Sequence, residues 1–175
     1  MALTPFISKQ EISEMNVRLG KIISKDYTDI LGPDESLLVV VTLKGAMIFG
    51  SDLIREISVP LELDFVRLAS YGSGTKSSGA VRFLKDMESS PEGRHILVLD
   101  EIVDSGRTLA FLNDHLSAFS PKSLRLCSLL SKPSRREVEV NIDYLGREIE
   151  DKFVVGYGLD FGEKYRNLPE ICILT

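Results

Sequence analysis

The densest group of chemically versatile residues lies in the segment HILVLDEIVDSGRTL, residues 95–109. An apolar run leads into two adjacent carboxylates, Asp100 and Glu101, and then into the short sequence DSGRT. Gly106 permits backbone conformations that are barred to bulkier residues, so several successive N–H groups can point at one anion, and the start of a following helix adds partial positive charge. Two hydroxyl side chains of the same turn can donate further hydrogen bonds: Ser105 and Thr108. This pattern is typical of a phosphate-binding turn.

The same segment also has a purely structural interpretation, in which the turn only caps a helix and the two acids are ordinary loop carboxylates. Spacing alone leaves both interpretations open. Position favours a ligand, because ligands of open α/β sheets bind beyond the carboxyl ends of the strands, where this turn would meet Lys44, Gly45 and Lys132. Paired acids beside a phosphate turn suggest a polyol phosphate, since carboxylates accept hydrogen bonds from vicinal hydroxyls or hold Mg²⁺ through water. The chain lacks the P-loop and dinucleotide-binding glycine fingerprints, so both of those classes are disfavoured.

The surrounding sequence predicts the α/β framework that would hold this turn. Ser8 and Glu11 have capping-box spacing, and apolar residues then recur at helical intervals, which predicts a helix over residues 9–25. Residues 37–43 are almost wholly apolar and rich in Val, as in a strand that is covered on both faces. The other expected elements are helices at 46–57 and 108–119 and strands at 95–99, 124–130 and 153–157, with 100–107 as a loop. Residues 61–70 and 81–84 flank a segment of a different kind, residues 71–80. Two strand–loop–helix units in succession predict a parallel sheet.

Length and composition point to a single globular domain over residues 1–175. The chain is 43% apolar, and its 21 Lys and Arg against 26 Asp and Glu give a net charge of −5. This acidic balance disfavours a nucleic-acid-binding protein, although it is compatible with a local basic pocket. No apolar run approaches the roughly 20 residues of a membrane-spanning helix, and the N-terminus lacks the pattern of a secretory signal, so we expect a cytoplasmic protein.

Three further features are interpreted as structural or dynamic. Cys127 and Cys172 lie in apolar, strand-like segments and are expected to be buried free thiols. His95 and His115 have no partner at metal-ligand spacing, so we expect no catalytic role for either. Residues 71–80, YGSGTKSSGA, contain three glycines, three serines and no aliphatic residue larger than Ala, which predicts a mobile loop.

Several segments of the chain resemble the type I phosphoribosyltransferases. Residues 95–109 resemble their signature for phosphoribosyl pyrophosphate. The sequences LKG (43–45), SYGSGTKSSG, LLSKPSRREVEVNIDYLG and FVVGYGLDFGEKYRNLPEI resemble those of hypoxanthine-guanine phosphoribosyltransferases, the 6-oxopurine branch of the family. The resemblance covers most of residues 36–172. It implies one α/β domain with a parallel twisted sheet, helices on both faces, a small hood from the N- and C-terminal segments, and a flexible lid at about residues 71–80.

The resemblance also implies a reaction. A 5-phosphoribosyl group would move from phosphoribosyl pyrophosphate to hypoxanthine or guanine, giving IMP or GMP and pyrophosphate in the presence of Mg²⁺. Asp104 would act as the general base near purine N7, and Glu101 and Asp160 would hold the metal. The residues implied for phosphoribosyl pyrophosphate are Lys44, Gly45, Asp100, Glu101, Val103, Asp104, Ser105, Gly106, Arg107, Thr108 and Arg166. Those implied for the purine are Lys132, Phe153, Val154 and Asp160, and those that anchor the lid are Ser70 and Tyr71.

Lys132 would set the preference for the base. An ammonium group donates hydrogen bonds and never accepts them, so it pairs with O6 of hypoxanthine or guanine but opposes the amino group of adenine. Two positions depart from the pattern: the acid pair reads Asp-Glu where the branch usually has Glu-Asp, and Ser105 replaces a Thr. Both positions keep their functional group, a carboxylate or a hydroxyl. The exchange of the two acids therefore changes only the reach of their side chains. In this family the peptide bond before the matching lysine can be cis, and dimers or tetramers are implied.

Two alternatives stay open on the sequence alone. One keeps the enzyme but changes the base to xanthine or a pyrimidine, since contacts to the base edge near Val154 and Asp160 would run through the backbone. The other is a nucleotide-sensing, RNA-binding regulator on the same scaffold. The acidic composition and the complete set of catalytic residues speak against the regulator.

Overall fold

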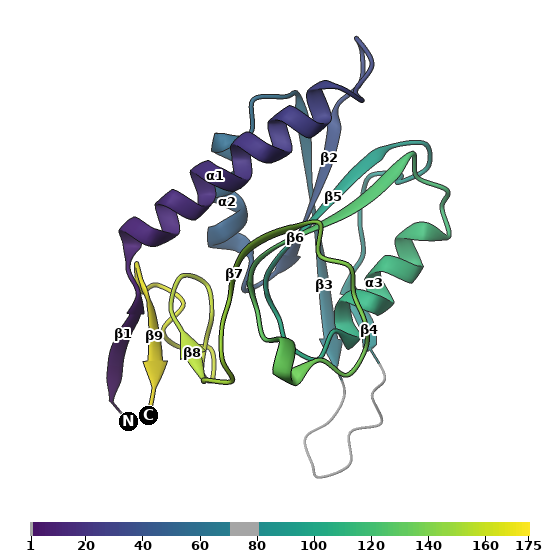
Figure 1. Ribbon diagram of the computed structural model, residues 1–175. Coiled ribbons are helices and arrows are strands. Elements are labelled where there is room, and N and C mark those ends of the chain that lie inside the picture. Colours follow the sequence, from purple (N-terminus) through teal and green to yellow (C-terminus); the bar gives the residue numbers. More distant parts are fainter. Residues whose placement is uncertain (1, 71–80) are drawn as a thin grey trace.

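A six-stranded sheet forms the centre of the molecule, seen in a computed structural model that describes residues 2–70 and 81–175 (Figure 1). The strand order is β4-β3-β2-β5-β6-β7. The central strands pair in parallel, and only the edge strand β4 runs antiparallel to its neighbour. The strands are β2 (Leu37–Leu43), β3 (Leu61–Ser70), β4 (Val81–Lys85), β5 (His95–Val103), β6 (Ser123–Ser131) and β7 (Tyr144–Glu148). The predicted parallel sheet is confirmed.

Helices cover both faces of this sheet. On one face α1 (Lys9–Thr28) and α2 (Met47–Glu56) pack together, and on the other lies α3 (Arg107–Ser117). Alternate side chains of β2 enter two different apolar clusters, Val39 with α1 and α2 and Val40 with α3. Because successive side chains of a strand point to opposite faces, an apolar run without alternation is what this position requires.

A second, three-stranded sheet joins the two ends of the chain. Its order is β1-β9-β8, from β1 (Leu3–Ile7), β9 (Ile171–Leu174) and β8 (Val154–Val155), all antiparallel. The termini lie side by side (Figure 1), and the Ala2 N–H donates to the Thr175 carbonyl over 2.7 Å. A 3₁₀ turn, η1 (Pro133–Arg135), follows β6. The small sheet places the segment after β8 against the carboxyl ends of the main strands.

The structure corrects several predicted boundaries. The helix expected over 9–25 continues to Thr28, and the helix expected over 46–57 is Met47–Glu56. The strand expected over 95–99 continues to Val103, so the acid pair sits in β5, in the ladder with β6, and not in a loop. The strand expected over 153–157 is only the two residues of β8, because Gly156 and Tyr157 both take positive φ. The helix expected over 108–119 runs from Arg107 to Ser117.

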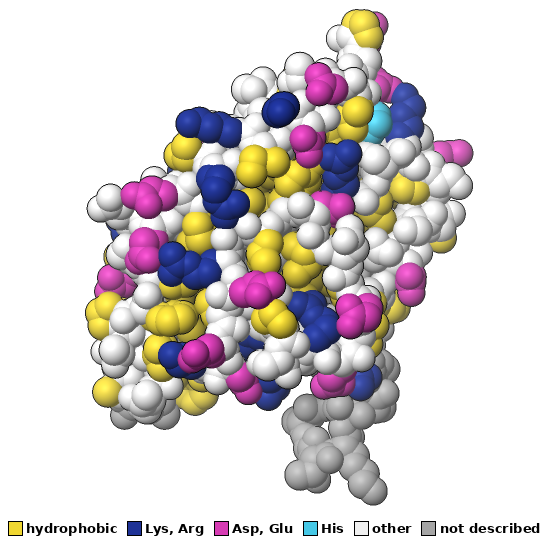
Figure 2. All heavy atoms as spheres, in the orientation of Figure 1, with side chains coloured by type: hydrophobic (Ala, Val, Ile, Leu, Met, Phe, Trp, Pro, Cys, Tyr) yellow, Lys and Arg dark blue, Asp and Glu magenta, His cyan; other side chains and the backbone are white. Residues whose placement is uncertain are grey.

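The remaining features of the described residues agree with expectation. Cys127 and Cys172 are buried and free, and burial raises the pKa of both thiols. Among the helices of residues 2–70 and 81–175 none is long and apolar enough to cross a membrane. On the face seen in Figure 2, basic and acidic side chains are interspersed, so this face presents no continuous basic surface. The loop expected at 71–80 lies outside the described residues.

The crossing of α1 and α2 depends on Gly20. A Cβ at this position would come within 2.7 Å of the carbonyl oxygen of Glu56, at the end of α2. Helix propensity alone favours Ala over Gly by roughly 1 kcal/mol. We expect the contact to reverse that sign, so that Gly20→Ala lowers the free energy of unfolding by roughly 1–3 kcal/mol.

Urea unfolding of Gly20→Ala beside Lys21→Ala tests this prediction. Lys21 is the next residue of α1 and is exposed, so its substitution is expected to change stability by less than about 0.5 kcal/mol. A Gly20→Ala protein as stable as the wild type would show that the helices do not need this close approach.

Candidate active site

The turn after β5 forms one wall of a cavity of about 230 Å³. Gly106 takes φ +85, and a Cβ there would overlap the Val138 carbonyl oxygen, so this position needs glycine. Helix α3 begins at the next residue, Arg107, with no side-chain cap. Gly106 offers no side-chain acceptor to the first turn of α3, and the Arg107 N–H makes only a long hydrogen bond to Ser105 Oγ, at 3.4 Å. Backbone donors and the helix dipole at this end suit an anion.

Backbone hydrogen bonds brace the turn from the segment after β6. The Ser105 carbonyl accepts from the N–H groups of Glu137, at 2.9 Å, and Val138, at 3.0 Å. The Lys132 N–H donates to the Val103 carbonyl over 2.9 Å. These bonds bring Lys132 to the turn, as predicted from the order of the elements, and they hold the turn in shape without using its hydroxyl groups.

Asp100 and Glu101 line the same cavity from the end of β5. The Thr42 hydroxyl, at the end of β2, contacts the Asp100 carboxylate. Burial raises the pKa of Asp100. Burial together with repulsion from Asp100 raises the pKa of Glu101 well above its usual range. The pair is therefore short of hydroxyl donors or a cation that would stabilise the ionised form.

The loop after β2 lies directly against this acid pair. The Leu43–Lys44 peptide bond is cis. A Cβ on Gly45 would overlap the Glu101 carboxylate, and a Cβ on Gly158 would overlap the Gly45 carbonyl. Two glycines thus allow three segments to meet: the end of β5, the loop after β2, and the loop after β8.

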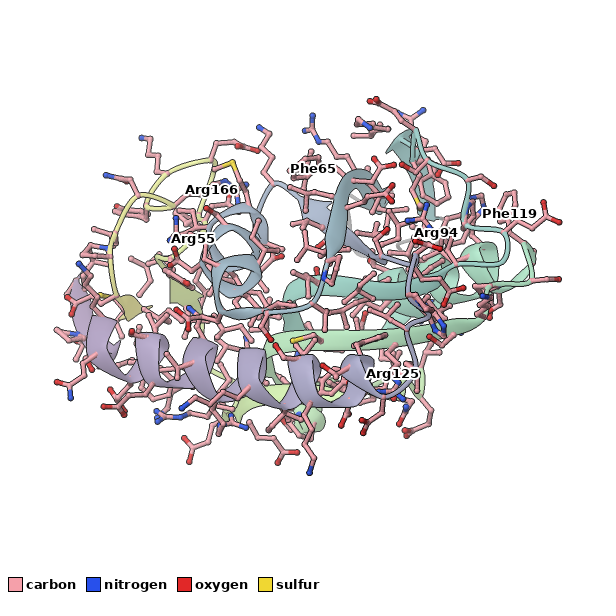
Figure 3. The ribbon with its side chains drawn as sticks, turned by 90° about the horizontal axis from the view of Figure 1, so that it is seen from above. Arg55, Phe65, Arg94, Phe119, Arg125 and Arg166 are labelled. Atoms are coloured by element: carbon pink, nitrogen blue, oxygen red, sulfur yellow. The ribbon has the colours of Figure 1, made fainter. Side chains whose placement is uncertain are left out.

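The loop after β8 brings a second set of charges to this junction. Arg166 donates to the Gly158 carbonyl over 2.7 Å and lies 2.9 Å from Asp160. Glu163 lies 2.8 Å from Lys44 and 3.4 Å from Arg166. Its contact with Lys44 holds the pKa of Glu163 below its usual range. Figure 3 places Arg166 on the side of this C-terminal loop, away from Arg94 and Arg125 near the amino ends of their strands.

The residues predicted for the purine lie on the other side of the turn. Lys132 is 8% exposed, with Nζ 3.8 Å from Asp151 Oδ1. Arg135 donates to Asp104 Oδ1 over 3.1 Å and lies 3.6 Å from Asp151. These contacts form a chain of alternating charge from Asp104 through Arg135 and Asp151 to Lys132.

The predicted aromatic residue is less closely connected. Phe153 is 51% exposed and meets Phe161 edge-on, with ring centroids 5.7 Å apart. Within residues 2–70 and 81–175, no hydrogen bond, ion pair or ring contact joins Phe153 to the turn at 103–108. Its link is Asp151, two residues earlier, and Val154 is buried in β8.

The other predicted residues differ in how they are placed relative to the turn. The Arg107 guanidinium turns to Glu137, 2.7 Å away, so only its backbone faces the turn. Ser70 ends β3, and Tyr71 lies outside the described residues. Sequence reasoning missed several residues that contact the predicted ones, among them Thr42, Arg135, Asp151 and Glu163. The only indication of these residues is that each is polar and lies close to a predicted residue, either along the chain or in the fold.

Comparison with known proteins agrees with this arrangement. The family model described as a phosphoribosyl transferase domain matches residues 10–162. The hypoxanthine-guanine phosphoribosyltransferase of Bacillus subtilis is 44% identical over 96% of this chain and 91% of its own length. The bifunctional protein TilS/HprT of Listeria monocytogenes is 46% identical over 96% of this chain, which spans only 25% of that protein.

Solved structures give the same result. A hypoxanthine-guanine phosphoribosyltransferase from Bacillus anthracis, with HEPES in its active site, superposes with a TM-score of 0.89 at 40% identity and covers 98% of both chains. The family model covers most of the chain, and these relatives match nearly all of it. The chain belongs to the phosphoribosyltransferase family, in its hypoxanthine-guanine branch.

Proposed function

We propose that the protein transfers a 5-phosphoribosyl group from phosphoribosyl pyrophosphate to hypoxanthine or guanine, giving IMP or GMP and pyrophosphate in purine salvage. The observation that carries the proposal is the meeting of a helix start with no N-cap side chain and a half-buried acid pair in one cavity, with cations on both sides of it. A sugar phosphate needs the first two features, and pyrophosphate and an oxo-bearing base need the cations.

The cavity would hold the sugar phosphate in one orientation. The 5-phosphate would accept from the backbone of Val103, Gly106 and Arg107, with hydroxyl donors at the same turn: Ser105 and Thr108. Asp100 and Glu101 would accept hydrogen bonds from the ribose hydroxyls. These bonds would offset the free-energy cost of removing the two carboxylates from water. The pyrophosphate would then lie at Gly45, towards Lys44 and Arg166, because Gly45 abuts Glu101.

Magnesium fits the donor set in its usual mode. Mg²⁺ keeps several waters and is held by one or two carboxylates together with substrate phosphates. Within residues 2–70 and 81–175 no group of three His, Cys, Asp or Glu side chains forms a protein-only cage. Glu101, with its unfavourable burial, and Asp160 would hold the ion with the substrate. The ion would neutralise charge on the departing pyrophosphate.

The purine would bind between Asp104 and Lys132. Asp104 would accept the proton of N7 as the base attacks the anomeric carbon, and Arg135 on Oδ1 leaves Oδ2 free for it. Lys132 would donate to O6, and because it is buried an amino group in place of O6 would leave it unpaired, which favours hypoxanthine and guanine over adenine. Phe153 would stack on the ring, and Val154 and Asp160 would contact its edge.

The proposal also covers the location, the ligands and the assembly of the protein. The protein would act in the cytoplasm on small-molecule substrates, without nucleic acid or membrane, as a homo-oligomer, either a dimer or a tetramer. In the hypoxanthine phosphoribosyl transferase of Trypanosoma cruzi, the C-terminal region has a role in the oligomeric state. The small sheet β1-β9-β8 would serve as the hood of a single domain over residues 1–175. The lid expected at about 71–80, next to Ser70, lies outside the described residues. A xanthine preference remains the alternative within the enzyme class.

Turnover with one base at a time tests the proposal. With phosphoribosyl pyrophosphate and Mg²⁺, we expect IMP from hypoxanthine and GMP from guanine, and no AMP from adenine. Loss of activity on chelation of the metal is also expected. Turnover with xanthine alone would favour the alternative, and no nucleotide from any base would refute the transferase.

Asp104→Asn tests the proton acceptor. We expect kcat to fall at least tenfold, within the 10²–10⁴ scale of acid–base catalysis, because an amide cannot take the N7 proton. The affinity for phosphoribosyl pyrophosphate should stay close to that of the wild type. Asp114→Asn, on the exposed side of α3, is the matched control and should leave kcat unchanged. Near-normal turnover by Asp104→Asn would exclude Asp104 as the base.

Glu101→Gln tests the electrostatics of the acid pair. A carboxyl whose pKa is raised on folding stabilises the protein below its unfolded pKa, and this contribution is lost as the pH rises through the folded pKa. We therefore expect unliganded Glu101→Gln to have a higher Tm than the wild type at about pH 8 and an equal Tm at about pH 4. Binding of phosphoribosyl pyrophosphate with Mg²⁺ should weaken.

The exposed Glu148→Gln is the control for loss of one charge and should show no such pH dependence. A Glu101→Gln protein that is less stable than the wild type at both pH values would mean that the ionised carboxylate is stabilised by its surroundings, contrary to the structure.

A further inference from the structure

One carboxylate oxygen bridges two cations in the proposed pyrophosphate subsite. Glu163 Oε2 lies 2.8 Å from Lys44 Nζ and 3.4 Å from the Arg166 guanidinium. Among the described residues, Glu163 is the only acid within ion-pair distance of Lys44, although the two are 119 residues apart in sequence. The position of this oxygen, shared between an ammonium and a guanidinium, is one that a diphosphate oxygen would take.

The local backbone presents Glu163 to these cations. Residues Phe161 and Lys164 form an isolated antiparallel bridge, and Gly162 and Glu163 between them both take positive φ, +58 and +67. The Glu163 N–H donates to Asp160 Oδ2 over 2.8 Å. A positive φ is uncommon for a residue other than Gly, so this conformation of Glu163 is a specific feature of the loop. Glu163 is thus held by its own turn and by a proposed metal ligand.

We propose that Glu163 is an internal anion that occupies the pyrophosphate subsite in the unliganded protein and must be displaced when phosphoribosyl pyrophosphate or pyrophosphate binds. This inference rests on the proposed function and names a residue that sets substrate affinity. The carboxylate competes with the diphosphate for Lys44 and Arg166, and after displacement its charge still repels the ligand. Glu163 therefore lowers the affinity of the site for the substrate and speeds the departure of the product.

The competing interpretation makes the opposite prediction. If Glu163 only orients Lys44 and Arg166, removal of its charge leaves two disordered cations and weakens binding of the diphosphate. If it is a displaced placeholder, removal of its charge strengthens binding. A gain in affinity cannot arise from damage to the fold, so the sign of the change separates the two roles.

Glu163→Gln is the test, because the amide keeps the size of the side chain and removes the charge. We expect the Kd of pyrophosphate with Mg²⁺, measured by calorimetry, and the KM of phosphoribosyl pyrophosphate to fall roughly two- to fivefold, the scale of an exposed ion pair. The KM of the purine should stay at its wild-type value. The kcat should not rise, because pyrophosphate leaves more slowly. Glu163→Asp keeps the charge and should restore wild-type affinity at least in part.

Glu92→Gln is the matched control for net charge. Glu92 is exposed and lies two residues before Arg94, which Figure 3 shows on the side of the molecule away from Arg166. Its substitution should leave both constants at wild-type values. Unchanged or weaker binding by Glu163→Gln overturns the proposal, and so does equal tightening by Glu92→Gln. If the wild type makes no nucleotide, the transferase proposal fails, while the pyrophosphate titration still decides the role of Glu163.

Discussion

Two adjacent carboxylates at the end of a strand buried on both faces are the constraint on which the site depends. Asp100 and Glu101 cannot move away from each other, because the ladder with β6 continues through them. Their burial raises both pKa values, so the ionised pair needs donors or a cation. Gly45 is glycine because the Glu101 carboxylate fills the space of its side chain. A polyhydroxyl ligand supplies what the protein alone does not.

The small sheet matters because the loop after its strand β8 carries Asp160, Glu163 and Arg166 to this pair. Its strand β8 ends in a loop in which Gly158 packs on Gly45 and Arg166 donates to the Gly158 carbonyl. Contact between backbones is possible only without a side chain at Gly158. The cations of the C-terminal loop are therefore fixed relative to the acid pair by glycine packing, and the two sheets form one site rather than two neighbouring surfaces.

Sequence reasoning succeeded where one local pattern determines the structure. The apolar run of β2, the capping box of α1 and the glycine turn before α3 each follow from periodicity or turn chemistry. It failed where a distant partner decides. Asp100 and Glu101 suggest a loop by composition, yet pairing with β6 keeps them in a strand. The contact between Lys44 and Glu163 joins residues 119 apart, and neither residue type indicates the other. The resemblance to a family supplied the residue roles that spacing left open.

The unliganded site has its charges matched internally on both sides of the acid pair. On one side Asp104, Arg135, Asp151 and Lys132 alternate in sign, and on the other Lys44, Glu163, Arg166 and Asp160 do the same. The exposed pairs among them, Lys44 with Glu163 and Arg135 with Asp104, contribute roughly 0–1 kcal/mol each, so a ligand can replace them at little energetic cost. A site of unpaired cations would attract any anion, whereas here a ligand must replace several partners together. A diphosphate joined through ribose to an oxo-bearing base can replace partners on both sides, and a simple anion can replace them only on one. Internal pairing thus makes the site selective for the whole substrate at a small cost in affinity.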